Sequence, residues 1–290
     1  MQKNACDFPE WINEFAVADE RFAHAYETVP GHRRALLKTA IARLFEWYGP
    51  SRTTARRLAE EWRGGFASVQ DTVPADYAVV VFDASLVSPA RLLAAVVPAL
   101  SCGVENVLAV RLGTGEWSAP VLAGLELAGQ ELVAEMDADR LKGLFEELDA
   151  SGAKGAVLGL ELPQGVFRAL RFPTRRIAFT CLRCDRSVPV WMDPEEPFDL
   201  EALAFSHPDL DFAVHGAEAA LPAGFSRGGK DFQGFLDSIR EVACAPASRV
   251  GEALDRARLV LGPGQEGCWV WPQLRPGHFH YHSTAWIIGA

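Results

Sequence analysis

The sequence predicts an α/β protein whose middle is a Rossmann-like parallel sheet covered by helices. Two observations carry this prediction. Between Asp76 and Leu160, short apolar runs alternate with helical patterns of ten to fifteen residues. Capping residues and helix breakers also stand at the boundaries of these runs. A helical N-terminal segment precedes this unit and an α+β part follows it, so we expect domains at 1–72, 73–162 and 163–290.

The N-terminal segment has the pattern of consecutive helices. Apolar residues keep a spacing of three to four positions from Trp11 onward, and a broad apolar stripe covers His32–Tyr48. Ser51 or Thr53 is then predicted to cap a third helix that runs to Trp62.

The central unit has the clearest element boundaries. Strands are expected at Tyr77–Phe82, Val107–Leu112, Leu132–Glu135 and Ala156–Leu160. Helices are expected at Ser88–Cys102, Ser118–Ala128 and Asp137–Leu148. Ser88 followed by Pro89 is a favourable helix start, and Asp137 is a second expected cap. Ligands of such sheets bind at the carboxyl ends of the strands.

After Leu162 the pattern is less regular and reads as α+β. Strands are expected at Arg176–Leu182, Ser187–Met192 and Arg258–Leu261, with Pro189 indicating an edge strand or a bulge. Helices are expected at Leu200–Phe205, Asp231–Val242 and Arg249–Arg256, and the tail from Cys268 to Ile288 is expected to be extended.

Composition limits the classes of function. The 290 residues carry a net charge of −10, which argues against a nucleic-acid partner, although a local basic cluster can override it at a site. No apolar run is long enough to span a membrane, and the N-terminus lacks the apolar stretch of a signal peptide. We therefore expect a cytoplasmic protein, whose six cysteines are not expected to form a disulfide scaffold.

The segment Ser88–Val110 (SPARLLAAVVPALSCGVENVLAV) combines a proline-started helix, Pro98-Ala99 near its end, Gly103 and a following strand. Together with Ala119–Ala123 and Leu127–Gly129, it resembles the nucleotide-binding region of the aldehyde and histidinol dehydrogenases. The resemblance implies an oxidoreductase that uses NAD or NADP. The catalytic motifs differ, because no Glu-Leu-Gly-Gly-Lys segment is present and no glutamate precedes a histidine. A degenerate relative that binds a small ligand or a partner is therefore the alternative.

Two loops are the candidate cofactor site. Gly113-Thr114-Gly115 follows the second strand of the unit, and its glycines would let backbone N–H groups approach a phosphate. Asp83 and Ser85 follow the first strand, and Asp83 could bind a ribose hydroxyl. The alternatives are a plain turn for the glycine loop and a backbone hydrogen bond for Asp83.

The alternating His278, His280 and His282 are candidate ligands of zinc or another divalent metal, because alternate side chains of a strand share a face. A solvated polar face is the alternative, and a metal-dependent protein is the third functional hypothesis. A single C-x-x-C motif is formed by Cys181-Leu182-Arg183-Cys184. It could be half of a zinc site, a redox pair or a coincidence.

Cys268 is the candidate nucleophile, with His280 or His282 as its base, and a buried structural cysteine is the alternative. The loop Ser226–Lys230 could bind a phosphate or carboxylate, or carry solvated charges. Trp269, Trp271 and Trp286 favour a core or a subunit interface, so a homo-oligomer is a further expectation.

Overall fold

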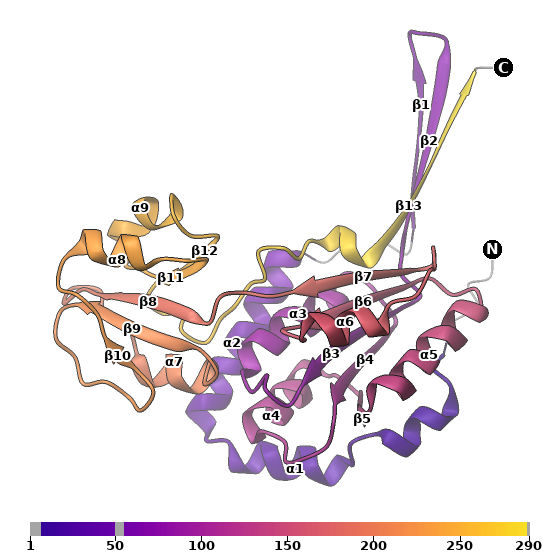
Figure 1. The fold of residues 1–290 in the computed structure, drawn as a ribbon. Helices are drawn as coiled ribbons and strands as arrows, with labels where there is room; N and C mark the ends of the chain where they lie inside the picture. Colours follow the sequence, from indigo (N-terminus) through magenta and orange to yellow (C-terminus); the bar gives the residue numbers. More distant parts are fainter. Residues whose placement is uncertain (1–6, 50–54, 289–290) are drawn as a thin grey trace.

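The computed structural model describes residues 7–49 and 55–288. Two parallel sheets lie side by side, and a long three-stranded arm projects away from them (Figure 1). The first sheet has the strand order β5-β4-β3-β6-β7, the second has the order β10-β9-β8-β11-β12, and the arm has the order β1-β2-β13. The α/β architecture predicted from the sequence is therefore confirmed.

The first sheet follows the predicted alternation of strands and helices closely. Its strands are β3 (Tyr77–Asp83), β4 (Asn106–Leu112), β5 (Leu132–Met136), β6 (Gly155–Leu160) and β7 (Ile177–Leu182). The connecting helices are α3 (Pro89–Ser101), α4 (Ala119–Ala128), α5 (Ala138–Ala150) and α6 (Gln164–Leu170). Since β7 pairs in parallel with β6, this sheet continues past the domain boundary expected at residues 162–163.

Both predicted helix caps are present. The Ser88 side chain accepts a hydrogen bond from the Arg91 backbone N–H, and the Asp137 side chain accepts one from Arg140. Gly129 ends α4 in the left-handed conformation with φ of 71°, which glycine adopts without steric cost. Local capping chemistry therefore sets the limits of these helices, as the sequence indicates.

The two faces of the first sheet bury different side chains of the same strands. Ala78, Val80 and Phe82 of β3 belong to a core shared with α3 and α4. Val79 and Val81 point to the other face, where they pack with α5 and α6. The N-terminal helices α1 (Asp19–Thr28) and α2 (Gly31–Tyr48) pack on α3 and α4, and the short helix η1 (Glu10–Phe15) joins the second core.

The second sheet is more regular than the sequence indicates. Its strands β8 (Ser187–Met192), β9 (Asp211–Gly216), β10 (Ser226–Arg227), β11 (Val242–Cys244) and β12 (Leu259–Leu261) are all parallel. The helices of this half are α7 (Leu200–Ser206), α8 (Phe232–Ser238) and α9 (Val250–Leu254), with the short turn η2 (Ala247–Arg249). Pro189 does not mark an edge, because β8 is the central strand. Pro189 lies opposite Ala213 of β9, whereas β8 pairs with β11 through Val190 and Cys244 alone.

The arm corrects the prediction for the N-terminal segment. Arg56–Trp62 is strand β1 and not the end of a third helix, and it pairs along its length with β2 (Phe66–Pro74). Its residues favour helices, but pairing with a partner strand overrides that preference. Ser51 and Thr53, the expected caps, lie outside the described residues.

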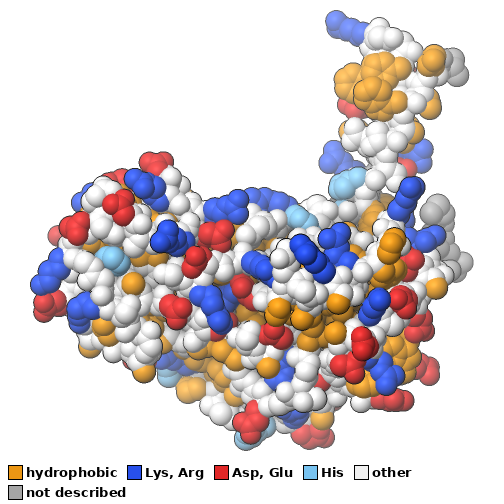
Figure 2. Space-filling view, viewed as in Figure 1, with side chains coloured by type: hydrophobic (Ala, Val, Ile, Leu, Met, Phe, Trp, Pro, Cys, Tyr) orange, Lys and Arg blue, Asp and Glu red, His pale blue; other side chains and the backbone are white. Residues whose placement is uncertain are grey.

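Strand β13 (His280–Ile288) completes the arm by pairing with the other edge of β2. Near the far end of the arm, the ring of Phe66 stacks on Trp62 and also contacts Trp286. Figure 2 shows hydrophobic side chains gathered in this part of the arm. Trp62 and Trp286 remain 47% and 75% exposed, so the arm is held together by its ladder and surface rings rather than by a core.

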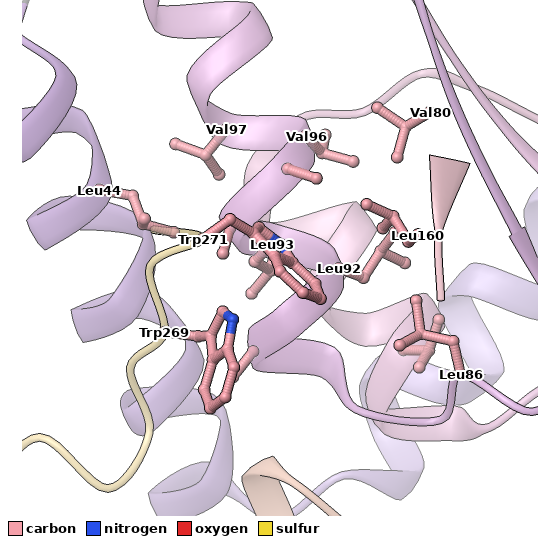
Figure 3. Close-up of a cluster of buried hydrophobic side chains, with 14 of the residues drawn as sticks. Leu44, Val80, Leu86, Leu92, Leu93, Val96, Val97, Leu160, Trp269 and Trp271 are labelled. Atoms are coloured by element: carbon pink, nitrogen blue, oxygen red, sulfur yellow. The ribbon is translucent and has the colours of Figure 1, made fainter. Parts of the chain in front are cut away.

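The chain segment before β13 crosses the body of the protein. Trp269 and Trp271 lie on this segment and are fully buried between α2 and α3 (Figure 3). The short helix η3 (Pro276–Phe279) then leads into the arm. Among the described residues, no helix has the length and apolar character needed to cross a membrane.

Candidate functional site

Asp83, Ser85 and Gly113–Gly115 lie together at the carboxyl edge of the first sheet, as predicted. Strand pairing sets Asp83 opposite Leu112, so the loops that follow β3 and β4 are neighbours. Ser85 and the three loop residues of Gly113–Gly115 are exposed. The Asp83 Oδ1 atom accepts hydrogen bonds from the backbone N–H of Ser85 at 2.9 Å and from its hydroxyl at 2.5 Å. Asp83 thus uses this oxygen to shape its own loop.

The glycine loop is fixed from beneath by Arg111. This buried arginine donates hydrogen bonds to the backbone carbonyl oxygens of Gly115 and Glu116, at 2.6 and 2.7 Å, and forms an ion pair with Glu135. Gly113 and Gly115 have φ values of 87° and 136°, which explains why glycines occupy both positions. Arg111 thus binds the carbonyl oxygens of the loop, whereas a phosphate would be bound by its backbone N–H groups. Phosphate binding by this loop therefore stays a prediction.

The expected ligand crevice lies on the same edge, between the carboxyl ends of β3 and β6. Strand order reverses between β3 and β6, and the carboxyl ends of such neighbouring strands are where doubly wound sheets open for ligands. Arg91, in the first turn of α3, reaches this point. Its guanidinium forms ion pairs with Glu161 at 2.5 Å and Asp209 at 2.8 Å. We call Arg91, Glu161 and Asp209 the switch-point cluster.

The switch-point cluster joins the two halves of the chain. Glu161 directly follows β6, whereas Asp209 lies between α7 and β9 of the second sheet. The side chains of Arg91 and Asp209 are 0% and 3% exposed. Glu161 has a positive φ of 53°, and its carboxylate also accepts a hydrogen bond from the Cys184 backbone N–H. A strained backbone at a strand end therefore holds the carboxylate against the guanidinium.

His207 and Ser88 continue the buried polar network. The Ser88 hydroxyl donates to the Ser206 carbonyl oxygen at 2.7 Å and lies 3.3 Å from His207 Nδ1. Burial, and then the nearby positive charge of Arg91, lower the pKa of His207 to about 3. His207 is thus a neutral imidazole near pH 7.

The C-terminal segment covers the cluster. The Trp271 indole N–H donates to the backbone oxygen of Arg91 at 3.0 Å, and the Arg91 guanidinium lies 5.3 Å from the Trp271 ring centroid. Trp269 packs edge-on against Trp271, with ring centroids 5.9 Å apart, and its ring centroid lies 5.7 Å from the same guanidinium. Ion-paired and aromatic side chains therefore fill the crevice between the ends of β3 and β6. The residues at this point leave no room for a nucleotide.

A ligand-sized cavity opens beside the C-terminal segment instead. It has a volume of about 740 Å³ and lies between α2, β12 and the segment that contains Cys268. Apolar and polar side chains both line it, namely Ala40, Arg43, Leu44, Glu46, Trp47, Leu254, Arg258–Leu261, Gln265, Cys268–Val270, Pro272 and Arg275. We call it the Cys268 cavity. Its volume is within the range typical of small-molecule sites.

Cys268 contacts an arginine within this cavity. The Arg43 guanidinium donates to Cys268 Sγ at 3.4 Å, and the same nitrogen donates to Gln265 Oε1 and the Gly264 carbonyl oxygen at 2.8 Å. The thiol is half-buried. A cysteine beside a guanidinium in a cavity has one part of a reactive setting, since a nucleophilic thiol also needs a base.

The predicted bases are not placed beside Cys268. His280 Nδ1 contacts the Pro276 carbonyl oxygen at 2.8 Å, and His282 Nδ1 contacts the Thr72 hydroxyl at 3.1 Å in the arm. His207 interacts with the backbone of Cys268, but its low pKa makes it a poor base. The structure therefore does not assemble the catalytic pair expected of Cys268 with His280 or His282.

The metal site predicted at His278, His280 and His282 is not supported. His278 Nδ1 accepts the backbone N–H of Arg275 at 3.0 Å, within η3, so it does not continue the strand face of the other two. Within residues 7–49 and 55–288, no group of three or more His, Cys, Asp or Glu side chains is placed to hold a metal ion. Zinc is therefore not part of the function proposed below.

The remaining motifs have structural partners. Cys181 and Cys184 are free thiols, and burial raises the pKa of Cys184 to about 12, which disfavours a thiolate. Arg227 donates to the Ala219 carbonyl oxygen, and Lys230 forms an exposed ion pair with Glu218 at 3.1 Å. Gly228 packs closely against His215, where a Cβ would lie 2.4 Å from the imidazole. The loop is thus closely packed on its own half.

Sequence reasoning missed the residues that define both sites. Arg91 lies inside an apolar helix, and no local pattern signals that Asp209 and Glu161 meet it from distant segments. Arg43 lies on a helix whose polar positions resemble an ordinary solvated face. One signal was available, because an arginine one turn after a helix start at the carboxyl edge of a sheet faces the expected crevice.

Comparison with known proteins gives likeness of structure alone. No protein-family description matches this sequence, and no curated protein matches it either. Histidinol dehydrogenase from Elizabethkingia anophelis superimposes with a TM-score of 0.57 at 12% identity, over 94% of this chain and 77% of that one. The two proteins share a fold over most of this chain.

Two aldehyde dehydrogenases support the same statement. Indole-3-acetaldehyde dehydrogenase from P. syringae, solved with NAD+, matches with a TM-score of 0.52 and 11% identity over 92% of this chain and 82% of that one. A putative aldehyde dehydrogenase from Burkholderia cenocepacia matches with a TM-score of 0.52 and 11% identity over 93% and 85%. The resemblance found in Ser88–Gly129 is confirmed as a likeness of fold.

Proposed function

We propose that this chain is a small-ligand-binding protein built on the dehydrogenase fold, in which the crevice of the first sheet has become core. One observation carries the proposal. The Cys268 cavity is open and ligand-sized, whereas the point where strand order reverses is filled by Arg91 and its two carboxylate partners. The alternative stated from sequence, a non-catalytic relative that binds a small ligand, agrees best with this arrangement.

A ligand screen with a site-specific readout tests the proposal. Small molecules are screened for a rise in melting temperature, and hits are then tested for protection of Cys268 from iodoacetamide by peptide mass spectrometry. Cys181 is the internal control, because it is also half-buried but does not line the cavity. Stabilising compounds that protect Cys268 and not Cys181 support the proposal. Stabilising compounds that never protect Cys268 contradict it.

The second candidate is an NAD- or NADP-dependent oxidoreductase. It is favoured by the exposed loops that carry Asp83, Ser85 and Thr114, and by the NAD+ complex of the P. syringae neighbour. Bound nucleotide would supply hydride transfer, but the filled crevice leaves no residue to which a reaction step is assigned. This candidate requires NAD+ or NADP+ to stabilise the fold by about 2.7 kcal/mol at one hundred times its dissociation constant. Unchanged melting with both nucleotides would remove it.

The expected homo-oligomer stays a prediction. The arm is the part of the described chain with the most exposed large apolar side chains, including Trp286 and Ile288 at 75% and 90%. Light scattering after size-exclusion chromatography measures the mass directly. If the arm forms the contact, Trp286→Ser together with Ile288→Ser lowers that mass to one chain. A monomeric wild type contradicts the prediction.

A further inference from the structure

The charge inside the Cys268 cavity is opposite to that of the whole chain. The protein carries a net charge of −10, yet three arginines and one glutamate line this cavity, namely Arg43, Arg258, Arg275 and Glu46. A concave site with an excess of one sign of charge concentrates ions of the opposite sign. The lining therefore selects against cations and favours an anionic group.

Two of these arginines have no carboxylate partner. Arg258 lies 3.7 Å from Glu241, but neither Arg43 nor Arg275 is within ion-pair distance of a carboxylate in the described part of the chain. Arg275 donates to the Leu274 carbonyl oxygen, and Arg43 donates to neutral acceptors and to the Cys268 thiol. A carboxylate in the cavity would give them the charge-assisted hydrogen bonds that the protein itself does not supply.

The rest of the lining is apolar and includes a large exposed ring. Leu44 and Val260 lie in the walls with Trp269, and Trp47 stands at the cavity with 70% of its surface exposed. Leu254 also lines the cavity and is 54% exposed. Burying such surfaces against a ligand is favourable, so the site suits a ligand with an apolar body.

We propose that the Cys268 cavity binds a small amphipathic anion, with a carboxylate near Arg43 and Arg275 and an aromatic or aliphatic body against Trp47. This deepens the proposed function, on which it rests, by naming the chemical class of the ligand. Cys268 lies in the wall beside Arg43 and reports occupancy through its accessibility to alkylation.

Three probes separate charge from apolar contact. They are 2-naphthoate, the neutral 2-naphthamide with the same ring system, and inorganic phosphate. We expect 2-naphthoate to bind at least about tenfold more tightly than 2-naphthamide by calorimetry, because it alone gains charge-assisted hydrogen bonds. We also expect it to protect Cys268 from iodoacetamide, and phosphate at the same concentration to give no protection.

Matched variants locate each part of the interaction. Arg43→Gln should weaken 2-naphthoate about tenfold and leave 2-naphthamide unchanged. Arg256→Gln is the control, because Arg256 is exposed, pairs with Asp237 and does not line the cavity. Trp47→Ser should weaken both naphthyl probes, whereas Trp286→Ser in the arm should weaken neither. If Arg43→Gln lowers the melting temperature strongly, Arg275→Gln replaces it.

The outcomes distinguish this proposal from the proposed function. If 2-naphthamide protects Cys268 as well as 2-naphthoate does, the anionic class is wrong and the binding cavity stands. If none of the three probes protects Cys268, the anionic class is also wrong, and the broader screen alone decides whether the cavity binds ligands. Equal losses with Arg43→Gln and Arg256→Gln would show a general charge effect and overturn the assignment.

Discussion

The two parallel sheets share one architecture but differ in how clearly their sequences express it. Strands of the first sheet have five to seven residues and most of these residues are buried, and its helices α3 and α5 have thirteen residues each. Strands of the second sheet shorten to three residues in β11 and β12 and two in β10, and α9 has five. A periodic pattern needs several repeats before it can be distinguished from chance, so the second sheet is hard to recognise from sequence.

The two halves also differ in the hydrophobic cores that stabilise them. The first sheet has cores on both faces, whereas the second shares the large core and adds the small cluster around Phe235 and Ala243. Arg91 connects the two halves through Asp209. We therefore expect the halves to unfold together, and the following changes test that expectation in order of decreasing effect.

Removing the charge of Arg91 is expected to have the largest effect. Arg91→Met leaves Glu161 and Asp209 without their cation, and loss of one partner of a buried ion pair costs about 3–5 kcal/mol. Urea denaturation monitored by tryptophan fluorescence measures this. Arg57→Met is the control, because Arg57 is exposed on the arm and its substitution should cost under about 1 kcal/mol. Equal, small losses for both variants would refute the role of Arg91 as a connection between the halves.

Adding a methyl group to β6 at Gly155 should lower the free energy of unfolding somewhat less than the loss of Arg91 does. The Cβ of Gly155→Ala would lie 2.0 Å from the ring of Tyr77, so the buried ring must move, at a cost of about 1–3 kcal/mol. Gly262→Ala, just after β12, meets its nearest atom at 3.9 Å and should be close to neutral. Denaturation of both variants compares packing at the ends of the two sheets. A neutral Gly155→Ala would mean that Tyr77 is loosely packed.

Acid should weaken the contact between the halves through His207. Because the pKa of His207 in the folded protein is about 3, below its usual value, the unfolded state takes up the proton first as the pH falls. Stability should therefore decrease below about pH 6.5, by about 1 kcal/mol between pH 7 and pH 5.5. His207→Asn should remove this part of the slope. Denaturation curves at several pH values test it, and an unchanged slope in the variant would contradict it.

Removing a helix cap should have the smallest effect on stability, and removing one cap in each half allows the two halves to be compared. Asp137 caps α5 of the first sheet, and Asp231 caps α8 of the second. Replacing either by alanine should cost about 1 kcal/mol. If the halves unfold together, both variants shift one calorimetric transition, whereas a second transition that only Asp231→Ala shifts would show independent unfolding.

The parts predicted correctly from sequence are those determined by nearby residues. Ser88 and Asp137 cap their helices through contacts within three positions. Tyr77–Phe82 pairs with distant strands, but its continuous β-branched run agrees with the conformation that this pairing imposes. Arg56–Trp62 was predicted wrongly, since its strand conformation depends on pairing with Phe66–Pro74 and is contrary to its local preference. The Cys268 cavity was predicted only in part. Cys268 was singled out, but Arg43 is 225 residues away in sequence and no local pattern connects them.

The arm imposes an order on folding. Its central strand β2 is synthesised before β13, the partner that covers one of its edges, which is more than two hundred residues later in the chain. Until a ribosome has released that partner, the β2 edge exposes unpaired backbone groups to any other extended chain. The hairpin of β1 and β2 can form at once, but closing the loop to β13 is a late, high-contact-order step.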